Sequence, residues 1–317
     1  MKKTILAMAV PALLAAGTAS AATVYDQDGV SVSIGGAAEV QIIQTYEFDG
    51  EDKNLDVRLD DGELNFTTEV AVSDSLTAIG FFDFENEGGS VKNSDLYAGL
   101  KGDFGKVTVG RQTTMWDDTF INEDIELGIE GVDKGGFEAS GDNVVKYKFE
   151  NDDFWLGVAH DLDAWNKDAK ANENNSHTDF GVGTTVAGVA LSGYYTTQEV
   201  KGGSDSDAWQ LSAVYSMDAF TFGASYTDFE VDKKKDKSGN IVELLAGYGV
   251  GDFQYYLGYN FGENDNDDKG SNIYANVTYK MHSNVKTYAE VGFAEKDPKG
   301  GKSDSANGFL VGLEVSF

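Results

Sequence analysis

Carboxylate side chains are concentrated in one stretch of the chain, Gln112 to Gly141. The stretch contains one base, Lys134, and eight acids: Asp117, Asp118, Glu123, Asp124, Glu126, Glu130, Asp133 and Glu138. Carboxylates that line a water-filled path lower the electrostatic barrier for cations and raise it for anions. The stretch lacks the alternation of a strand, and so long a connection inside a compact domain is commonly functional. We therefore expect Gln112 to Gly141 to be a functional segment rather than a strand.

Residue types that carry out catalysis or hold metals are sparse elsewhere. The chain has no cysteine, which excludes disulfides, thiolate metal sites and cysteine nucleophiles. His160, His177 and His282 lie on different segments without metal-ligand spacing, so we expect each at the surface or rim. The segment Asp265 to Gly270 resembles half of a calcium loop, but Lys269 occupies a ligand position. We expect no catalytic residue, no cofactor and no bound metal.

The composition and the first residues of the chain limit which partners and which cellular location are possible. The chain has 54 acids against 24 Lys and Arg, a net charge of −30, and binding to nucleic acid needs a basic surface, so that partner is excluded. Residues 1–21 combine Lys2 and Lys3, an apolar run from Ile5 to Ala16 and the small residues Ala19-Ser20-Ala21. This pattern is typical of a secretory signal peptide. We expect residues 22–317 to form one exported domain.

The elements that must position the acids are strands. Sixteen segments of about ten residues show period-2 alternation: 30–48, 56–72, 76–85, 94–100, 106–110, 143–149, 154–162, 178–186, 189–200, 208–216, 220–231, 240–250, 253–261, 271–281, 285–294 and 306–317. Successive side chains of a strand point to opposite faces. The last segment accordingly has a wholly apolar face, made of Phe309, Val311, Leu313, Val315 and Phe317.

The connections between these segments alternate between two kinds. Short turns such as Ser73 to Ser75 and Gly102 to Gly105 alternate with long polar loops such as Asp163 to His177. This pattern places turns at one end and loops at the other, as in an up-and-down transmembrane barrel. Aromatic residues beside the short turns predict an interfacial girdle: Phe104, Phe149, Phe154, Phe220, Phe222, Phe253 and Tyr279.

The sequence therefore predicts an all-β fold, a 16-stranded antiparallel transmembrane β-barrel with one long loop, residues 112–141, folded into the lumen. A mean hydropathy of −0.34 fits a polar lumen inside an apolar outer surface. A soluble all-β protein such as a secreted sandwich or propeller is the alternative fold. A sandwich of so many strands would need a second apolar core.

Several motifs resemble those of the general porins of Gram-negative outer membranes, and the vibrio-type members look most similar. They are Val24 to Gly29, Tyr97 to Gly105, Val109-Gly110-Arg111 and the terminal Phe317. The resemblance implies a homotrimeric barrel in outer-membrane lipid and lipopolysaccharide that passes small hydrophilic solutes and ions. It also implies that Phe317 is the assembly signal and that Glu87, in the loop Asn86 to Asn93, latches a neighbouring subunit.

The same resemblance identifies Gln112 to Gly141 as the loop that forms the constriction. Asp118 and Asp124 match acids of the family's loop. Three positions where the family carries arginines on the barrel wall hold other residues here: Glu63, Ser94 and Ser140. By alternation, the bases that remain on the inner side are Lys146 and Lys148, next to outward Val145, Tyr147 and Phe149.

Acids on both sides of the constriction predict a cation-selective pore. The loop acids Asp117, Asp118, Asp124 and Glu126 would face the wall acids Glu63, Asp83 and Glu85. For each loop acid, a hydrogen bond that fixes the loop to the wall is the alternative role. A structural or adhesive barrel with a plugged lumen is the alternative function, and an outer-membrane protease is a further one. The paired-acid and Asp-His motif of such a protease is absent from the sequence.

Overall fold

The computed structural model describes residues 21–48, 54–86, 89–119, 121–128, 137–162, 176–200, 203–232 and 237–317. The predicted signal peptide therefore lies outside the described residues, apart from Ala21. The strands are β1 (Ala22–Gln27), β2 (Val30–Gln44), β3 (Asp56–Ser73), β4 (Leu76–Glu85), β5 (Lys92–Gly102), β6 (Gly105–Thr113), β7 (Ser140–Glu150), β8 (Phe154–Asp161), β9 (Ser176–Val186), β10 (Val189–Glu199), β11 (Ser206–Met217), β12 (Phe220–Val231), β13 (Gly239–Val250), β14 (Phe253–Asn264), β15 (Lys269–His282), β16 (Val285–Asp297) and β17 (Asp304–Ser316). A 3₁₀ helix, η1 (Asp117–Thr119), follows β6.

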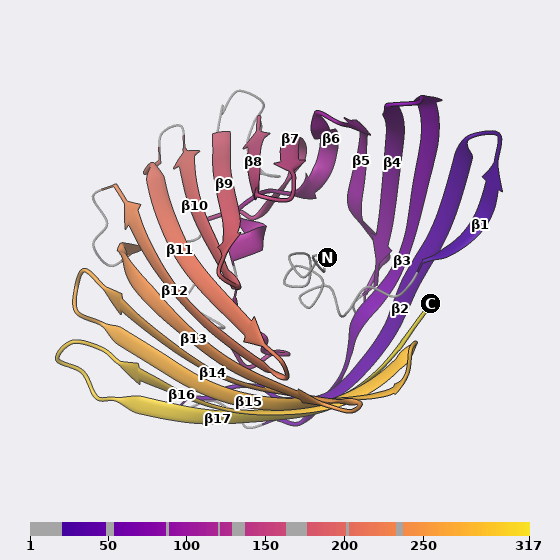
Figure 1. Cartoon of the computed structure of the whole chain (residues 1–317). Coiled ribbons are helices and arrows are strands. Elements are labelled where there is room, and N and C mark those ends of the chain that lie inside the picture. Colours follow the sequence, from indigo (N-terminus) through magenta and orange to yellow (C-terminus); the bar gives the residue numbers. More distant parts are fainter. Residues whose placement is uncertain are drawn as a thin grey trace.

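Strands β2 to β17 form a closed antiparallel ring (Figure 1). Each pairs with its neighbour in the sequence, and β17 pairs with β2 to close the circle, from Phe309 opposite Gln44 to Ser316 opposite Ala37. Phe317 continues this seam, because its backbone N–H and C=O both bond to Gly36. Closure removes the free sheet edges that would otherwise expose unpaired backbone groups to lipid. The ring confirms the predicted 16-stranded barrel.

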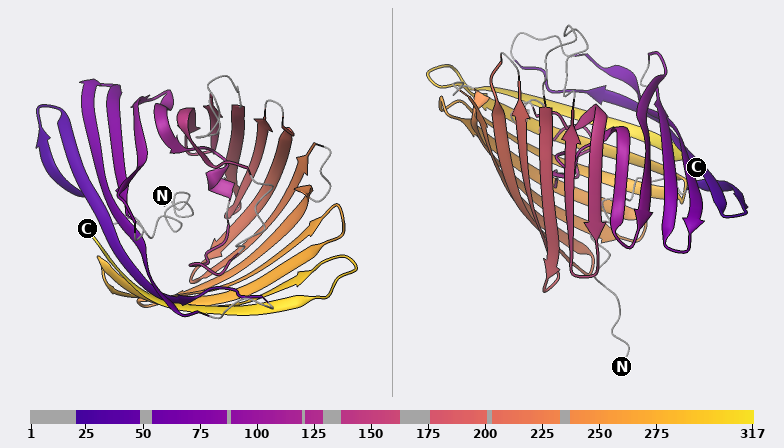
Figure 2. Two further views of the ribbon diagram at one scale, coloured as in Figure 1. Left: turned by 180° about the vertical axis from the view of Figure 1, so that it is seen from behind. Right: turned by 90° about the horizontal axis from the view of Figure 1, so that it is seen from above.

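The strand β1 lies outside this ring and was not predicted. It pairs with the first part of β2, from Ala22 opposite Ile34 to Gln27 opposite Val30, beyond the end of β17. The turn between them has positive φ at Asp28 (52°) and Gly29 (76°), as a two-residue hairpin turn of this kind requires. Figure 2 shows this hairpin projecting past the neighbouring strands.

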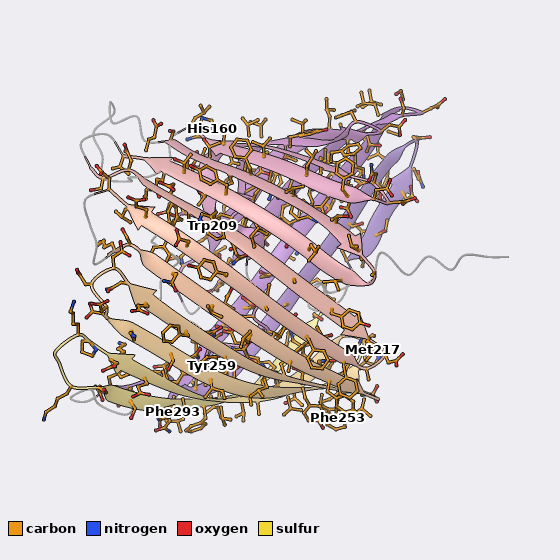
Figure 3. The ribbon with its side chains drawn as sticks, turned by 60° about the vertical axis from the view of Figure 1, so that its left-hand side comes forward. His160, Trp209, Met217, Phe253, Tyr259 and Phe293 are labelled. Carbon is orange, nitrogen blue, oxygen red and sulfur yellow. The ribbon has the colours of Figure 1, made fainter. Side chains whose placement is uncertain are left out.

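The two faces of the barrel wall differ in polarity, as the alternation predicts. On β17 the apolar side chains from Phe309 to Val315 are exposed on the outside, whereas Glu314 and Ser316 lie on the inner face and are buried. The outward side chains cover the surface seen in Figure 3, where Tyr259 on β14 and Phe293 on β16 are labelled, with β15 between them. An exposed apolar band of this kind suits a lipid surround.

One end of the barrel carries short turns and the other carries the long connections. At the turn end, the ring of Phe253 lies 4.6 Å from that of Tyr279 and the ring of Phe220 lies 4.9 Å from that of Tyr248. Met217 and Phe253 mark this end in Figure 3. These aromatic contacts belong to the girdle that the sequence predicts. Among the described residues, no helix is both long and apolar enough to cross a membrane.

Candidate functional site

The segment that follows β6 begins by binding to strands β7 and β9. The ammonium of Lys146 donates to the backbone oxygens of Thr113 and Thr114, at 3.1 Å each. The backbone N–H of Trp116 donates to Asp179 Oδ2 at 3.0 Å, and the Trp116 side chain is buried. Asp179 is itself held by Thr196 and His177. Polar side chains of the inner face therefore fix the start of the segment.

The segment then contacts strands on a distant part of the ring. Asn122 Nδ2 donates to Glu243 on β13 at 3.2 Å. The backbone N–H of Glu123 donates to the hydroxyl of Tyr274 on β15 at 3.0 Å, and Asn276 Nδ2 donates to the backbone oxygen of Glu123 at 2.6 Å. Each of these wall residues is buried and lies on the inner face of its strand. Side chains of the wall thus form the hydrogen bonds with the backbone of the segment that, in a strand, a neighbouring strand would form.

A single carboxylate, Glu290 on β16, holds the next turn of the segment. It accepts the backbone N–H groups of Ile125 (2.7 Å), Glu126 (2.9 Å) and Leu127 (2.6 Å). The backbone oxygen of Leu127 in turn accepts hydrogen bonds from Tyr46 and from Asn272. Three converging N–H donors form a concave site for an anion, so Glu290 fixes the local backbone conformation.

The side chain of Glu126 contacts β2 and β3, which lie on the other side of the β17–β2 pairing from Glu290. It forms a salt bridge with Arg58 and accepts a hydrogen bond from Gln41 at 3.1 Å. Arg58 also contacts Asp60 at 2.8 Å. Arg58, Leu59, Asp60, Asp61, Ile125 and Glu126 line an open cavity of about 540 Å³. Here the segment and the barrel wall meet across a water-accessible space.

The wall beside this cavity is strongly acidic. Glu39, Asp60 and Asp61 bring carboxylate oxygens within 4.8 Å of one another. Farther along the inner face, Glu63 pairs in register with Glu85, and Asp83 follows on the same strand. Like charges directly opposite each other on a sheet are destabilising, so this arrangement serves something other than stability.

Three acids of the segment have raised pKa values: Asp117, where desolvation is the main cause, Glu123 and Asp124. Burial raises the pKa of Glu123 to about 7, and the neighbouring charge of Asp124 adds to the shift. Burial and the charge of Glu290 raise the pKa of Asp124 to about 6, although the N–H of Gly128, which donates to Asp124 Oδ2 at 2.8 Å, opposes the shift. Glu123 and Asp124 therefore titrate closer to neutral pH than ordinary carboxylates do.

The predicted site residues fall into separate groups. Asp117 and Asp118 are exposed on η1, and their charges reach Lys146 on β7. Lys148 places its ammonium 5.5 Å from the centre of the Trp155 ring. Ser94 lies in the β5 bulge beside Asp83, and Ser140 pairs with Thr113 at the start of β7. The predicted residues Glu130, Asp133 and Glu87 lie outside the described residues.

One prediction was wrong. His177 is neither a surface nor a rim residue, because it is 1% exposed. Its Nε2 lies 2.5 Å from Asp179 Oδ1 and 2.7 Å from Thr196 Oγ1. The polar partners on adjacent inner-face positions offset the cost of burying an imidazole. By contrast, His282 is exposed and His160 is half-buried.

Several residues of the site were missed. Arg58 was missed because bases were sought only at the positions where the porin family carries wall arginines. Its neighbours Val57 and Leu59 are exposed on the outer face, which implies that the Arg58 side chain points inward. Glu290 gave no signal, because its role depends on a segment more than 160 residues away. The structure also brings Lys101 and Lys106 beside Lys148, a cluster that only the register between strands reveals.

Comparisons with known proteins agree with this architecture. Residues 6–299 match the family model described as "Gram-negative porin". The chain is 36% identical over the full length of both chains to "Porin-like protein H" of Photobacterium profundum, and 28% identical over the full length of both to "Outer membrane protein U" of Vibrio parahaemolyticus. The trimer form of OmpT, an outer membrane protein of Vibrio cholerae, superposes with a TM-score of 0.75 at 19% identity, over 92% of this chain and all of that one.

Proposed function

The chain belongs to the Gram-negative porin family and is an outer-membrane channel for passive transport without enzymatic activity, and we propose that its lumen is cation-selective. The observation that carries this proposal is the carboxylate group formed by Glu39, Asp60 and Asp61 beside Glu126. Among the described residues, Arg58 is the base in salt-bridge contact with this group. A small lumen surface with four carboxylates and one guanidinium attracts cations.

The proposal includes the position and role of the acidic loop. The predicted bounds of the loop were too wide, because Gln112 and Thr113 belong to β6 and pair with Gly141 and Ser140 of β7. In this proposal the connection between β6 and β7 lies within the lumen and narrows it, which is supported by the hydrogen bonds from Trp116, Asn122, Glu123 and Leu127 to inner-face side chains of β9, β13, β15 and β16. The narrowest part would then lie where Glu126 approaches Arg58 and Asp60. A cation passing this point would meet carboxylates on both sides, as the sequence predicts.

The wall acids that the loop approaches differ from the ones expected. Glu126 lies beside Asp60 and Glu39, whereas the expectation named Glu63, Asp83 and Glu85. On the β7 side, Asp117 and Asp118 lie near Lys146, so that part of the path carries both signs. The net charge of the constriction still favours cations in this proposal, because the acids near the cavity outnumber Arg58.

The remaining expectations stay proposals of the same function. We propose a homotrimer, supported by the trimer form of the similar OmpT structure. Glu87 would latch the neighbouring subunit, Phe317 would act as the assembly signal, and residues 1–21 would be removed as a signal peptide. Outer-membrane lipid and lipopolysaccharide would surround the exposed apolar band.

The test is the reversal potential of the purified protein in a planar bilayer under a KCl gradient. Cation selectivity predicts a potassium-biased value, and a chloride-biased value would refute the proposal. Replacing Asp118→Asn and Glu126→Gln together should reduce the permeability ratio about tenfold per charge, because a unit charge ~6 Å away in water changes the entry of potassium and of chloride about threefold each, in opposite directions. Asp74→Asn, in the exposed turn between β3 and β4, removes a charge away from the constriction and should leave the ratio unchanged.

A plugged lumen remains the competing function, and solute uptake separates it from a channel. Liposomes that contain the protein should swell in small sugars at rates that fall with sugar size. A plugged barrel would give no size-dependent swelling.

A further inference from the structure

Lysine side chains gather on the inner face at the turn end of the barrel. In the sheet register, Lys106 on β6 stands opposite Lys101 on β5 and opposite Lys148 on β7. Lys146 lies two residues farther along the same face of β7. Across the ring, Lys280 on β15 stands opposite Lys286 on β16. We call these six residues the turn-end lysines.

Such pairings cost stability, and only part of the charge is neutralised. Like charges directly opposite each other destabilise a sheet. Lys101 contacts Glu69 at 2.5 Å and Lys286 contacts Glu314 at 2.5 Å. Among the described residues no salt bridge includes Lys106, Lys148 or Lys146. In a chain of net charge −30, this retained basic zone is unexpected on composition alone.

Several inner-face acids lie farther from the turns than the turn-end lysines do. On β5, Asp95 is six residues from Lys101, and on β16, Glu290 is four residues from Lys286. On β4, Asp83 and Glu85 are seven and nine residues from the first residue, Leu76. Four inner-face acids are exceptions: Glu69 and Glu314, which are paired with turn-end lysines, Glu150, which is two residues nearer the turn than Lys148, and Glu39, which stands opposite Glu314. On β4, β5 and β16 the wall therefore becomes more acidic with distance from the turns, and among the described residues the six turn-end lysines outnumber the acids near them.

The separation of the two zones is comparable to the screening length of dilute salt. Six residues of strand span about 20 Å, and a strand tilt of about 40° reduces this to about 15 Å along the axis. The Debye length is about 10 Å at 0.1 M salt and about 3 Å at 1 M. In dilute salt each zone therefore controls the ions in its own part of the lumen, and in concentrated salt neither does.

We propose that the lumen is a bipolar channel that rectifies ionic current, with an anion-attracting zone at the turn end in series with the cation-attracting zone toward the loop end. The proposal rests on an open pore, the function proposed above. When the loop side is positive, cations enter through the acidic zone and anions through the basic zone, so both accumulate where the zones meet. With the opposite polarity each ion must first cross the zone that repels it, and the lumen is depleted.

The acids near the basic zone set its extent. Asp117 and Asp118 interact electrostatically with Lys146, and Asp118 also with Lys106. They lie on η1, in the segment that leaves the loop end of β6. Lys106 and Lys148, one and two residues from the ends of their strands, are the outermost of the β6–β7 lysines and should contribute most to the basic zone.

The test is the current–voltage curve of single channels in symmetric KCl. We expect the current at 100 mV with the loop side positive to exceed the current at the opposite polarity by roughly 1.5-fold in 0.1 M KCl, and the ratio to approach 1 in 1 M KCl. The orientation of each channel can be determined afterwards. The chain has no cysteine, so Ser303→Cys, in the exposed connection between β16 and β17, gives one biotinylation site for streptavidin binding at the loop end.

Two variants separate the basic zone from other sources of asymmetry. Lys106→Gln with Lys148→Gln should bring the ratio at 0.1 M KCl close to 1, and should not harm folding because it removes a pair of opposed like charges. Lys299→Gln with Lys302→Gln removes the same charge from the exposed loop end and should leave the ratio high. Trimer mobility on a gel checks assembly of both.

The outcomes are decisive. A linear curve for the parent protein at 0.1 M KCl, or a ratio that survives in Lys106→Gln with Lys148→Gln, overturns the bipolar channel. The reversal potential of the same channels tests selectivity separately. A chloride-biased reversal potential with lysine-dependent rectification would refute cation selectivity and support the bipolar channel. A potassium-biased reversal potential with a linear current–voltage curve would support cation selectivity and refute the bipolar channel.

Discussion

The carboxylate of Glu290 accepts a hydrogen bond from the backbone N–H of Leu127 at 2.6 Å, although 163 positions separate the two residues in the chain. The same carboxylate accepts two further backbone N–H groups and the side-chain amide of Asn276. One strand residue thus holds a turn of the acidic segment that has no strand partner of its own. The position of Glu126, which follows from this turn, depends on a wall residue rather than on local sequence.

Replacing Glu290 should loosen this turn. In Glu290→Gln one acceptor oxygen becomes an NH₂ donor that faces N–H groups, leaving at least one buried donor without a partner, which costs about 1–3 kcal/mol. We expect larger open-channel noise and a higher mean conductance in bilayer recordings, because the segment moves away from its wall position. Glu230→Gln, an exposed residue of β12, is the matched control and should behave as the parent. Parent-like noise in Glu290→Gln would show that the anchor is dispensable.

The contact between Gly258 and Tyr274 gives a second prediction. The two residues are opposite each other on β14 and β15, and a Cβ added at Gly258 would lie 2.1 Å from the Tyr274 ring. The ring therefore lies over the glycine and presents its hydroxyl to the N–H of Glu123. Gly258→Ala must displace the ring and should cost about 1–3 kcal/mol.

A milder variant divides this effect into two parts. Tyr274→Phe keeps the ring in place and removes only the hydroxyl, so it should cost about 1 kcal/mol. The midpoint of thermal unfolding measures both changes, and Gly258→Ala should lower it more. Equal midpoints for the two variants would contradict the steric argument. Gly251→Ala is unsuitable as a control because its φ is positive (59°), whereas Gly80→Ala meets no atom within 4 Å.

The sequence predicted the barrel well because its wall has one apolar and one polar face. Alternation is a local property, so the ends of β4 and β12 were predicted at the observed residues, Leu76–Glu85 and Phe220–Val231. Other strands continue past the alternation. An example is β6, which extends to Thr113 beyond a bulge at Gly110, where φ is 137°. β1 was missed because all six of its residues are exposed, which leaves no buried face to detect.

The site was less predictable because it depends on which residues meet across the ring. Sequence alternation places Arg58 and Glu290 on the inner face. It does not indicate that Arg58 contacts the side chain of Glu126, or that Glu290 accepts the backbone N–H of Glu126. Comparison with expected arginine positions also directed attention to Glu63 rather than Asp60. Long-range contacts of this kind are set by barrel closure and strand stagger, which a local pattern does not encode.

Removing Arg58 should raise cation selectivity. Its guanidinium contacts Asp60 and Glu126 and neutralises part of the acidic surface at the cavity. Arg58→Gln should therefore increase the potassium-to-chloride permeability ratio about tenfold, because a unit charge ~6 Å away in water changes the entry of each ion about threefold, in opposite directions. Arg111→Gln is the matched control, because Arg111 pairs with Asp142 on the other face of the wall. An unchanged permeability ratio in Arg58→Gln would show that the acidic surface beside Arg58 does not determine ion selectivity.

The raised pKa values of Glu123 and Asp124 predict a change of selectivity near neutral pH. Burial raises the pKa of Glu123 from 4.5 to about 7 and that of Asp124 from 3.8 to about 6. Both carboxyls are neutral below these values and charged above them. The permeability ratio for cations should therefore rise between pH 5 and pH 8, where ordinary carboxylates no longer titrate.

Stability should change in the opposite direction over the same range. A carboxyl whose folded pKa is raised stabilises the folded state below its unfolded pKa, and this contribution is lost as the pH rises through the folded value. For Glu123 the window runs from about pH 4.5 to about pH 7 and is worth about 3 kcal/mol. Glu123→Gln stays neutral at every pH, so it should abolish the selectivity change near pH 7 and the loss of stability between about pH 4.5 and pH 7 that is due to Glu123. Because the Gln variant keeps the backbone N–H that Tyr274 accepts, a pH profile identical to that of the parent would assign the titration to other groups.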